Sequence, residues 1–194
     1  MGTNDTNDTE GIISKSYATG FVDGSDKTGG FAGANYGNID SSYATGSVDG
    51  GHDTGGLVGF NERIVTNTYA RGSVKGINNV GGLVGSNYGL FLGKDKVYIN
   101  CSYATGFVEA INTVGKRYEA GLVGNNDGQV NYCYYDKNTT GKSDTGKGAP
   151  KTTAEMMKKS TFEVWDFGGT WDIGISPASY PYFKWQGTKN IPTP

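Results

Sequence analysis

Four aspartates lie in two similar glycine-rich stretches and could bind a cation together. The stretch "DGSDKTGG" contains Asp23 and Asp26, and "DGGHDTGG" contains Asp49 and Asp53. Carboxylate oxygens are ligands that Ca²⁺ prefers, and like charges placed side by side repel each other unless a cation or water lies between them. The sequence therefore raises the hypothesis of a calcium site at these four residues, although solvated turns of the same composition need no metal.

The rest of the titratable residues do not form a catalytic pattern. His52 is the single histidine, and the HExxH, GxSxG and phosphate-loop patterns are absent. A polysaccharide lyase or hydrolase is the enzymatic alternative, but such an enzyme needs clustered carboxylates beside a basic residue, and the basic residues here are scattered. We therefore predict that the chain is not an enzyme and that it carries no cofactor other than the hypothetical calcium.

A recurring tyrosine is the most regular chemical group in the chain. The sequence "SYATG" begins at residues 16, 42 and 102, and the variant "TYARG" begins at residue 68. Tyrosine combines an apolar ring, able to stack on a sugar, with a polar hydroxyl group, and the adjacent threonines and arginine add hydrogen-bonding groups. The candidate ligand-binding residues are therefore Tyr17, Tyr43, Tyr69, Arg71 and Tyr103, with carbohydrate or a host or cell-surface component as the partner.

These groups recur because the chain is built from repeats. The tyrosines at 17, 43 and 69 are 26 residues apart, and the glycine doublets that end at 30, 56 and 82 keep this interval. The fourth unit is longer, and we interpret its extra residues as loops. Each unit consists of strand-forming residues and Gly/Asn/Asp turns, so the repeats are built from short strands. The units are too short for the blades of a propeller, which need about 40 residues each. The prediction is an all-β parallel β-helix, or β-solenoid, of about five coils of about 26 residues each. Bacterial β-helices are more often right-handed, so we expect that hand.

Alternation along the strand predicts which side chains face the core. The sixth residue after each tyrosine is charged, so this parity should face solvent: Asp23, Asp49, Lys75 and Glu109. The tyrosines share this parity and should form an outward column beside a threonine column, while alanine and valine face inward. A bulge at the tyrosine would turn the ring inward instead, and this alternative stays open.

A second strand carries the tetrads "GFAG" and "GLVG", each followed by an asparagine. We expect these asparagines to stack, because each amide can donate a hydrogen bond to the amide of the next coil: Asn35, Asn61, Asn87 and Asn126.

The two cysteines are predicted to be free thiols. Cys101 lies two residues before its tyrosine and Cys133 lies one residue before, so alternation points them to opposite faces of the strand. Cys133 should be buried in the place of a serine.

The tetrads and the "SYATG" stretches together resemble the GLUG-motif repeat over about residues 11–136. Such repeats occur in large bacterial cell-surface and secreted proteins. These include filamentous-haemagglutinin-like adhesins and immunoglobulin-A-cleaving metallopeptidases, in which the repeats are not the catalytic part. The resemblance implies extracellular display on a bacterial β-helix, at the cell surface or in a secreted protein, without implying one ligand. The sequence departs from the pattern at Ala32, at Arg71 and at "YYDKN".

Residues 150–186 differ from the repeats and are expected to cap the exposed end of the solenoid, which would otherwise be an open sheet edge. They contain all three tryptophans, and Thr152 and Glu155 form the capping box of a short helix. The tryptophans could alternatively be sugar-stacking platforms. The predicted organisation is a polar tail or leader at 1–10, the solenoid at 11–149, the cap at 150–186 and the start of a linker at 187–194.

Composition narrows the partners. Seventeen basic and 19 acidic side chains leave a formal net charge of −2, so there is no basic surface for nucleic acid. No apolar stretch approaches the length of about 18 residues that is needed to cross a bilayer, so we expect no membrane insertion.

The leading hypothesis is a non-catalytic extracellular adhesive or spacer module of a larger chain. The alternative is a carbohydrate-binding module of a secreted glycan-degrading enzyme or scaffold.

Overall fold

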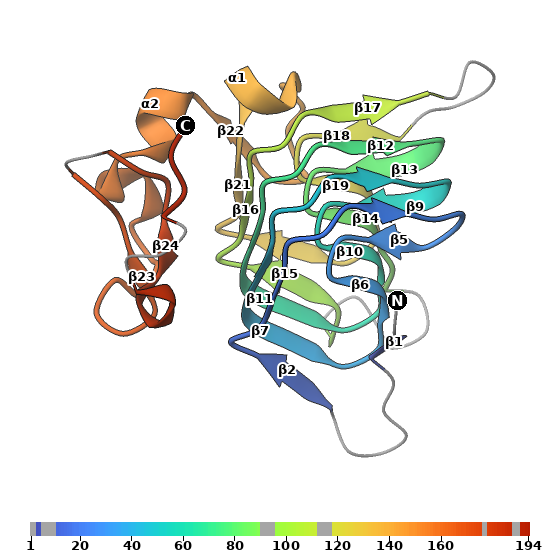
Figure 1. Cartoon of the computed structure of the whole chain (residues 1–194), viewed down its shortest axis with the longest axis horizontal. Coiled ribbons are helices and arrows are strands. Elements are labelled where there is room, and N and C mark those ends of the chain that lie inside the picture. Colours follow the sequence, from blue (N-terminus) through green and yellow to red (C-terminus); the bar gives the residue numbers. More distant parts are fainter. Residues whose placement is uncertain (1–2, 5–10, 90–95, 112–117, 176–177, 188–190) are drawn as a thin grey trace.

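The computed structural model describes residues 3–4, 11–89, 96–111, 118–175, 178–187 and 191–194. Short parallel strands stack on one another in four sheets that surround a narrow core (Figure 1). The prediction of an all-β fold with stacked parallel strands is confirmed. The arrangement is consistent with a β-solenoid, while the number of coils and their hand stay predictions.

The largest sheet, here called the tyrosine sheet, has nine strands. They are β2 (Ile12–Ser14), β3 (Tyr17–Ala18), β7 (Asn38–Ala44), β11 (Ile64–Ala70), β15 (Tyr98–Asn100), β16 (Tyr103–Ala104), β20 (Gln129–Asn131), β21 (Tyr134–Asp136) and β22 (Ala149–Lys151).

The sheet that carries the tetrads has five strands in the order β1-β6-β10-β14-β19. They are β1 (Thr3–Asn4), β6 (Ala32–Asn35), β10 (Val58–Asn61), β14 (Val84–Asn87) and β19 (Val123–Asn126). The expected polar tail thus contributes β1, which pairs with β6, and its remaining residues lie outside the described ones.

Two four-stranded sheets complete the wall. One contains β4 (Val22–Asp23), β8 (Val48–Asp49), β12 (Val74–Gly76) and β17 (Val108–Ala110), and the other contains β5 (Thr28–Gly29), β9 (His52–Gly55), β13 (Asn78–Gly81) and β18 (Glu119–Ala120).

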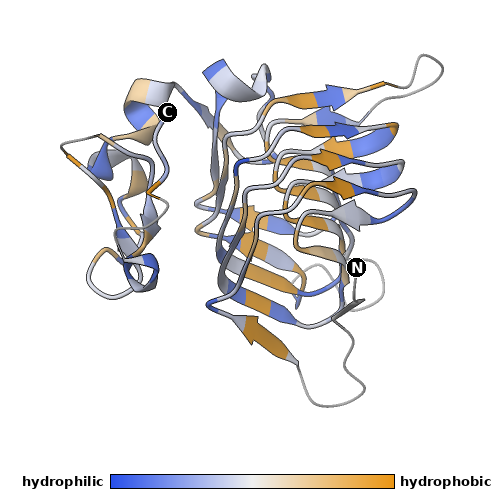
Figure 2. Ribbon diagram, in the orientation of Figure 1, coloured by the Kyte–Doolittle hydropathy of each residue, from blue (hydrophilic) through white to orange (hydrophobic). Residues whose placement is uncertain are grey.

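The sequence interval sets the register of these sheets. Tyr43 pairs with Tyr17 on one side and with Tyr69 on the other, and Tyr69 pairs with Tyr103. Identical positions of successive repeats therefore lie one above another. Figure 2 shows the result as hydrophobic bands that recur on successive strands.

The inner core consists of small and branched apolar side chains, which fit a narrow interior. Ile39, Ala44 and Leu57 are buried there together with their equivalents in the following repeats. The predicted asparagine ladder is also present. The side-chain Nδ2 of Asn35 donates to Asn61 Oδ1 at 2.7 Å, and Asn61 Nδ2 donates to Asn87 Oδ1 at 2.8 Å.

A bulge in each tyrosine strand explains how its side chains keep their facing. Ile39 and Ala44 both belong to the inner core, although five residues separate them and simple alternation would place them on opposite faces. Ser41 between them has a φ of 47°, so one residue in the left-handed region supplies the extra step. Equivalent residues of the other repeats share this conformation: Lys15, Asn67, Cys101 and Tyr132. Because the bulge precedes the tyrosine, the ring still points away from the inner core.

The C-terminal end of the stacked repeats is closed by residues 137–151. After α1 (Lys137–Thr140), β22 returns to pair with β21. The buried ring of Tyr135 fills the top of the core, and its hydroxyl donates to the carbonyl oxygen of Asp144 at 2.6 Å. We call residues 11–151 the repeat body.

The segment that was expected to cap this end lies elsewhere. The C-terminal segment (residues 152–187) runs along the outer face of the tyrosine sheet (Figure 1). It contains α2 (Thr153–Met156), two 3₁₀ turns, η2 (Lys159–Phe162) and η3 (Lys184–Gln186), and an antiparallel pair of strands, β23 (Trp171–Asp172) and β24 (Tyr182–Phe183). The predicted capping box of Thr152 and Glu155 is present at the start of α2. The physical reason for the lateral position is that the outward tyrosine rings offer a large apolar surface, whereas residues 137–151 already cover the end.

Candidate functional site

The candidate ligand-binding tyrosines form a continuous stack on the outer face of the tyrosine sheet. Ring centroids are 5.2 Å apart between Tyr17 and Tyr43, 4.7 Å between Tyr43 and Tyr69, and 5.1 Å between Tyr69 and Tyr103. The ring planes are within 12° of parallel. This spacing follows from the distance of about 4.8 Å between hydrogen-bonded strands.

The three inner rings of this column are not available at the surface. The exposed fraction is 2% for Tyr43, 1% for Tyr69 and 0% for Tyr103, because the C-terminal segment packs on them. Its buried covering side chains are Met156, Phe162, Trp165, Trp171, Tyr180 and Phe183. In the described structure these tyrosines join two parts of the molecule, and the expected open ladder is closed along most of its length.

Hydrogen bonds fix the covering segment to the column. The hydroxyl of Tyr103 donates to the Pro181 carbonyl oxygen at 2.6 Å, and the side chain of Gln186 is hydrogen-bonded to the Tyr69 hydroxyl at 2.8 Å through Nε2. Burial raises the pKa of both phenols above the ordinary tyrosine value, and the neighbouring tyrosine of the stack raises it further. These phenols stay protonated and act as hydrogen-bonding and packing groups.

Tyr17 is the exception, because the covering segment does not extend over it. Its ring stacks on Tyr43 on one side, yet 57% of the residue is exposed. A groove with a volume of about 530 Å³ opens beside this ring. Its lining residues are Tyr17, Thr19, Tyr43, Thr45, Arg71 and Ile191. The structure thus brings Tyr17, Tyr43 and Arg71 into one groove and leaves Tyr69 and Tyr103 out of it.

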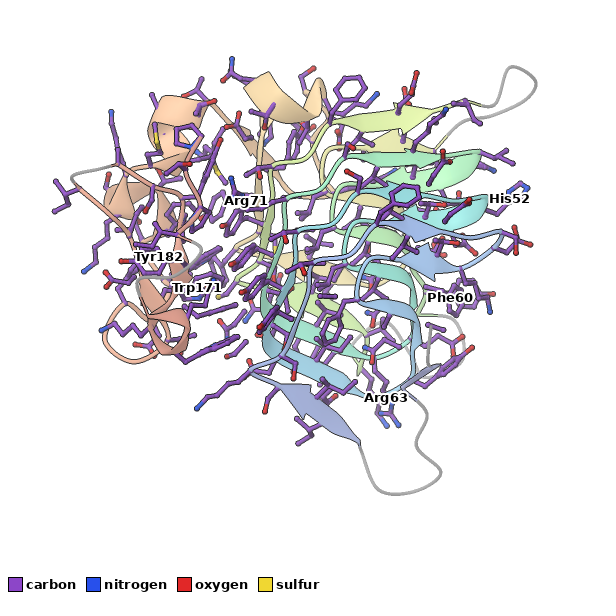
Figure 3. The ribbon with its side chains drawn as sticks, in the orientation of Figure 1. His52, Phe60, Arg63, Arg71, Trp171 and Tyr182 are labelled. Carbon is purple, nitrogen blue, oxygen red and sulfur yellow. The ribbon has the colours of Figure 1, made fainter. Side chains whose placement is uncertain are left out.

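Arg71 lies between the repeat body and the C-terminal residues (Figure 3). Its Nη2 donates to the carbonyl oxygen of Thr193 at 2.6 Å, and its guanidinium lies 5.9 Å from the centre of the Tyr180 ring. Its Nε is buried without a hydrogen-bond partner among the described residues. The chain end also folds back here, since Tyr180 N donates to the carbonyl oxygen of the buried Pro192 at 2.9 Å. Nothing in the sequence indicated that Ile191, within residues 187–194 that were expected to start a linker, would line a groove.

The four candidate calcium ligands do not converge. Asp23 and Asp49 lie next to each other on paired strands, followed in the same column by Lys75. Asp26 accepts a hydrogen bond from the backbone of His52, and Asp53 accepts from Asn79 and Ser86 at 2.7 and 2.6 Å. Within the described ranges, no group of three or more His, Cys, Asp or Glu side chains could hold a metal ion. A calcium site stays a prediction, with Asp23 and Asp49 as the pair nearest to each other in register.

The cysteines follow the prediction from alternation. Both are free and buried, Cys133 among the inner core residues and Cys101 in the cluster beneath the C-terminal segment. Burial raises the pKa of both thiols, so neither is an activated nucleophile.

The motif of these repeats can now be identified. Residues 27–49, which run from the residue before β5 to the end of β8, match the family model of the GLUG motif. The chain carries the GLUG motif. In this structure the GLUG match contains one tetrad strand, one tyrosine strand and the bulge at Ser41.

One relative is similar to part of the chain. A "Putative Gly-rich membrane protein" of Evansella cellulosilytica is 44% identical over 88 residues, which are 42% of this chain and 10% of the relative. The chain therefore spans about a tenth of the length of that relative. No solved structure matches the chain significantly. Among its described residues, no helix has the length and apolar character needed to cross a membrane.

Proposed function

We propose that the chain is a non-catalytic adhesive or spacer module of a larger bacterial surface protein, displayed outside the cell. In this proposal the GLUG repeats form a right-handed β-solenoid of about five coils of about 26 residues. The presence of the GLUG motif and the similarity to a much longer protein named as a membrane protein support the assignment.

The observation that carries the proposal is that the tyrosine column is buried as packing between the repeats and the C-terminal segment. Tyr43, Tyr69 and Tyr103 recur because they pack the repeats against one another and against the C-terminal segment. A residue type that repeats in order to build a continuous core is typical of a solenoid, in which each repeat buries its surface against its neighbours. The recurring motif is therefore primarily structural, and contact with a partner is left to the parts of the surface that remain open.

Incubation with polysaccharides tests the absence of catalysis. The full chain would be mixed with neutral, acidic and amino-sugar polysaccharides, and new reducing ends and unsaturated sugars would be measured. We expect no product with any of them. Product that disappears when the protein is heat-denatured would contradict the proposal.

Display on a cell tests the adhesive or spacer function. The chain would be fused between an N-terminal epitope and a membrane anchor, and antibody access to the epitope would be compared with a fusion that lacks residues 11–187. We expect greater access with the module, because a stack of rigid repeats separates the epitope from the cell. Equal access would argue against a spacer.

A carbohydrate-binding module of a secreted glycan-degrading enzyme or scaffold is the second candidate. The groove beside Tyr17 favours it, since an exposed aromatic ring and two threonines meet there. A dedicated module should bind one family of soluble glycans on an array, whereas a pure spacer should bind none.

Calcium binding at Asp23 and Asp49 is a separate proposal. Its support is the register of the two carboxylates on paired strands. The melting temperature would be measured with CaCl₂ and with a chelator, in the native chain and in Asp23→Asn. A calcium-dependent rise in the native chain that the variant loses is the expected result, and equal melting in both solutions would argue against the site.

A further inference from the structure

We propose that the groove beside Tyr17 binds a carbohydrate that carries a carboxylate, such as a uronic acid. The sugar ring would stack on Tyr17, its hydroxyl groups would contact Thr19 and Thr45, and its carboxylate would face Arg71. The inference rests on the adhesive function proposed above and names the ligand class of that surface.

The ring of Tyr17 is a preorganised platform. Tyr43 has a stacked ring on both faces, whereas Tyr43 is the one stacked neighbour of Tyr17 among the described residues, with the two planes differing by 10°. The stacked neighbour holds the ring orientation, so little conformational freedom is lost when a ligand covers the other face. An exposed aromatic face of this kind suits the apolar face of a sugar ring, and the phenol adds a polar edge.

The two threonines add hydrogen-bonding groups on the same side. Each follows its tyrosine by two residues, just after the end of its strand, and Thr19 lines the groove together with Tyr17. Thr45 follows β7 in the next repeat, where its backbone N–H donates to the Ala18 carbonyl oxygen at 3.0 Å. Adjacent repeats are about 4.8 Å apart, which is within the span of the hydroxyl groups of one sugar ring. Hydroxyl groups both donate and accept, as sugar hydroxyls do.

Arg71 gives the groove its preference for a negative charge. Arg71 is the one charged residue among the described residues that line the groove. No described carboxylate forms a salt bridge with it. Its Nε is buried and has no hydrogen-bond partner among the described residues, so a ligand in the groove would approach the other side of the guanidinium. A ligand carboxylate in the groove could face this guanidinium, which offers several planar donors that match carboxylate geometry.

The end of the chain shows how an oxygen atom binds at this position. The carbonyl oxygen of Thr193 accepts from Arg71 Nη2 at 2.6 Å, and Nε has no acceptor in the described part of the chain. The arginine is therefore held in place by its own chain, with its positive charge beside the groove. A neutral sugar could use the Tyr17 platform, but it would leave this charge uncompensated.

Titration with matched sugars tests the inference. Oligogalacturonate and a neutral galacto-oligosaccharide of the same length would be titrated into the full chain by calorimetry, at low and high NaCl concentration. We expect the acidic oligomer to bind at least about tenfold more tightly than the neutral one, with affinity that falls as salt rises. Equal affinity for the two oligomers, or binding of neither, would overturn the inference.

Substitutions locate the site. Tyr17→Ala should weaken binding of the oligogalacturonate at least about tenfold. The comparison is with nucleobases stacked on aromatic side chains, where each stacked ring contributes about 1–3 kcal/mol. Arg71→Gln should abolish the preference for the acidic oligomer, and Arg71→Lys should restore part of it by returning the charge. The matched control is Tyr132→Ala, which removes a tyrosine of similar exposure, 56%, outside the groove lining. An equal loss in Tyr132→Ala would show that binding occurs elsewhere.

These outcomes are separable from those of the proposed function. Loss of the predicted sugar binding leaves a non-catalytic surface module intact, whereas release of sugar products would contradict that module even if the groove binds uronic acids.

Discussion

The hydroxyl of Tyr103 donates a hydrogen bond of 2.6 Å to the carbonyl oxygen of Pro181, 78 residues later in the chain. Both residues are buried, and both belong to the contact between the tyrosine column and the C-terminal segment. A bond of this kind makes the segment part of the same core as the repeats, so the two should unfold together.

Removing this hydroxyl should destabilise the protein. Tyr103→Phe keeps the ring but leaves the Pro181 carbonyl oxygen buried without its donor, and we expect the free energy of unfolding to fall by about 1–3 kcal/mol. Urea denaturation followed by tryptophan fluorescence measures this change. The control is Tyr17→Phe, in the same column but exposed, where the change should stay within about 0.5 kcal/mol. Equal effects in the two variants would mean that the buried bond contributes nothing.

A glycine column limits how the repeats can vary. A Cβ at Gly72 would overlap the carbonyl oxygen of Gly46, a main-chain atom that cannot move aside, whereas a Cβ at Gly20 meets nothing within 4 Å. Gly72→Ala should therefore reduce the melting temperature strongly or prevent folding, and Gly20→Ala should leave it nearly unchanged. Both variants replace glycine with alanine at equivalent positions of different repeats. The change in intrinsic backbone propensity is therefore the same in both, and a difference in melting temperature reports the steric overlap. Tolerance of Gly72→Ala would show that successive repeats are less closely packed than the structure indicates.

Much of the architecture could be predicted from the spacing of a few residues. The number of residues between Tyr17 and Tyr43 is the length of one repeat. Because this length is constant, equivalent residues of successive repeats pair in parallel and in register. Charged residues in the column of Asp23 and Asp49 fixed the outward parity, and the tyrosines follow it. Local rules of this kind succeed because each repeat packs against its neighbours in the same way.

The features that depend on distant contacts were harder to predict. An aromatic segment must be covered, but its composition does not specify which surface covers it, and the segment around Trp171 packs on the tyrosine column instead of the solenoid end. The sequence did contain a signal for this contact. Tyr43 and Tyr69 were predicted to face outward and the C-terminal segment is aromatic, so two apolar surfaces could be buried by packing against each other. A bulge was considered at the tyrosine itself, but its actual position two residues earlier was not predicted, because its left-handed residues, such as Lys15 and Cys101, have no common side-chain chemistry.

The asparagine ladder should contribute to stability at its centre. Asn61 accepts from Asn35 and donates to Asn87 and to the carbonyl oxygen of Arg63, all in a buried setting. Asn61→Ala leaves a donor and an acceptor of its neighbours unpaired, so we expect a loss of about 2–3 kcal/mol in the free energy of unfolding. Asn131→Ala, at an exposed position, is the matched control and should have little effect. A small loss at Asn61 would indicate that water replaces the missing amide.

Stability should fall in alkaline solution because of the buried phenols. Burial raises the pKa of Tyr69, Tyr103 and Tyr180 in the folded protein, whereas the unfolded chain has the ordinary value of about 10. Above that value the unfolded state binds fewer protons than the folded state, so the free energy of unfolding decreases as pH rises, by about 1.4 kcal/mol per pH unit for each such tyrosine. Below about pH 10 this contribution is complete.

Denaturation curves between about pH 8 and 11, together with the ultraviolet absorbance of tyrosinate, measure this effect. We expect part of the tyrosinate signal to appear only as the protein unfolds. The informative comparison is with Tyr103→Phe, which lacks one buried phenol. Its stability should fall less steeply with pH than that of the native chain, by about the contribution of one tyrosine. Parallel pH dependence in the two proteins would show that Tyr103 ionises as easily when folded as when unfolded, which its complete burial beneath the C-terminal segment argues against.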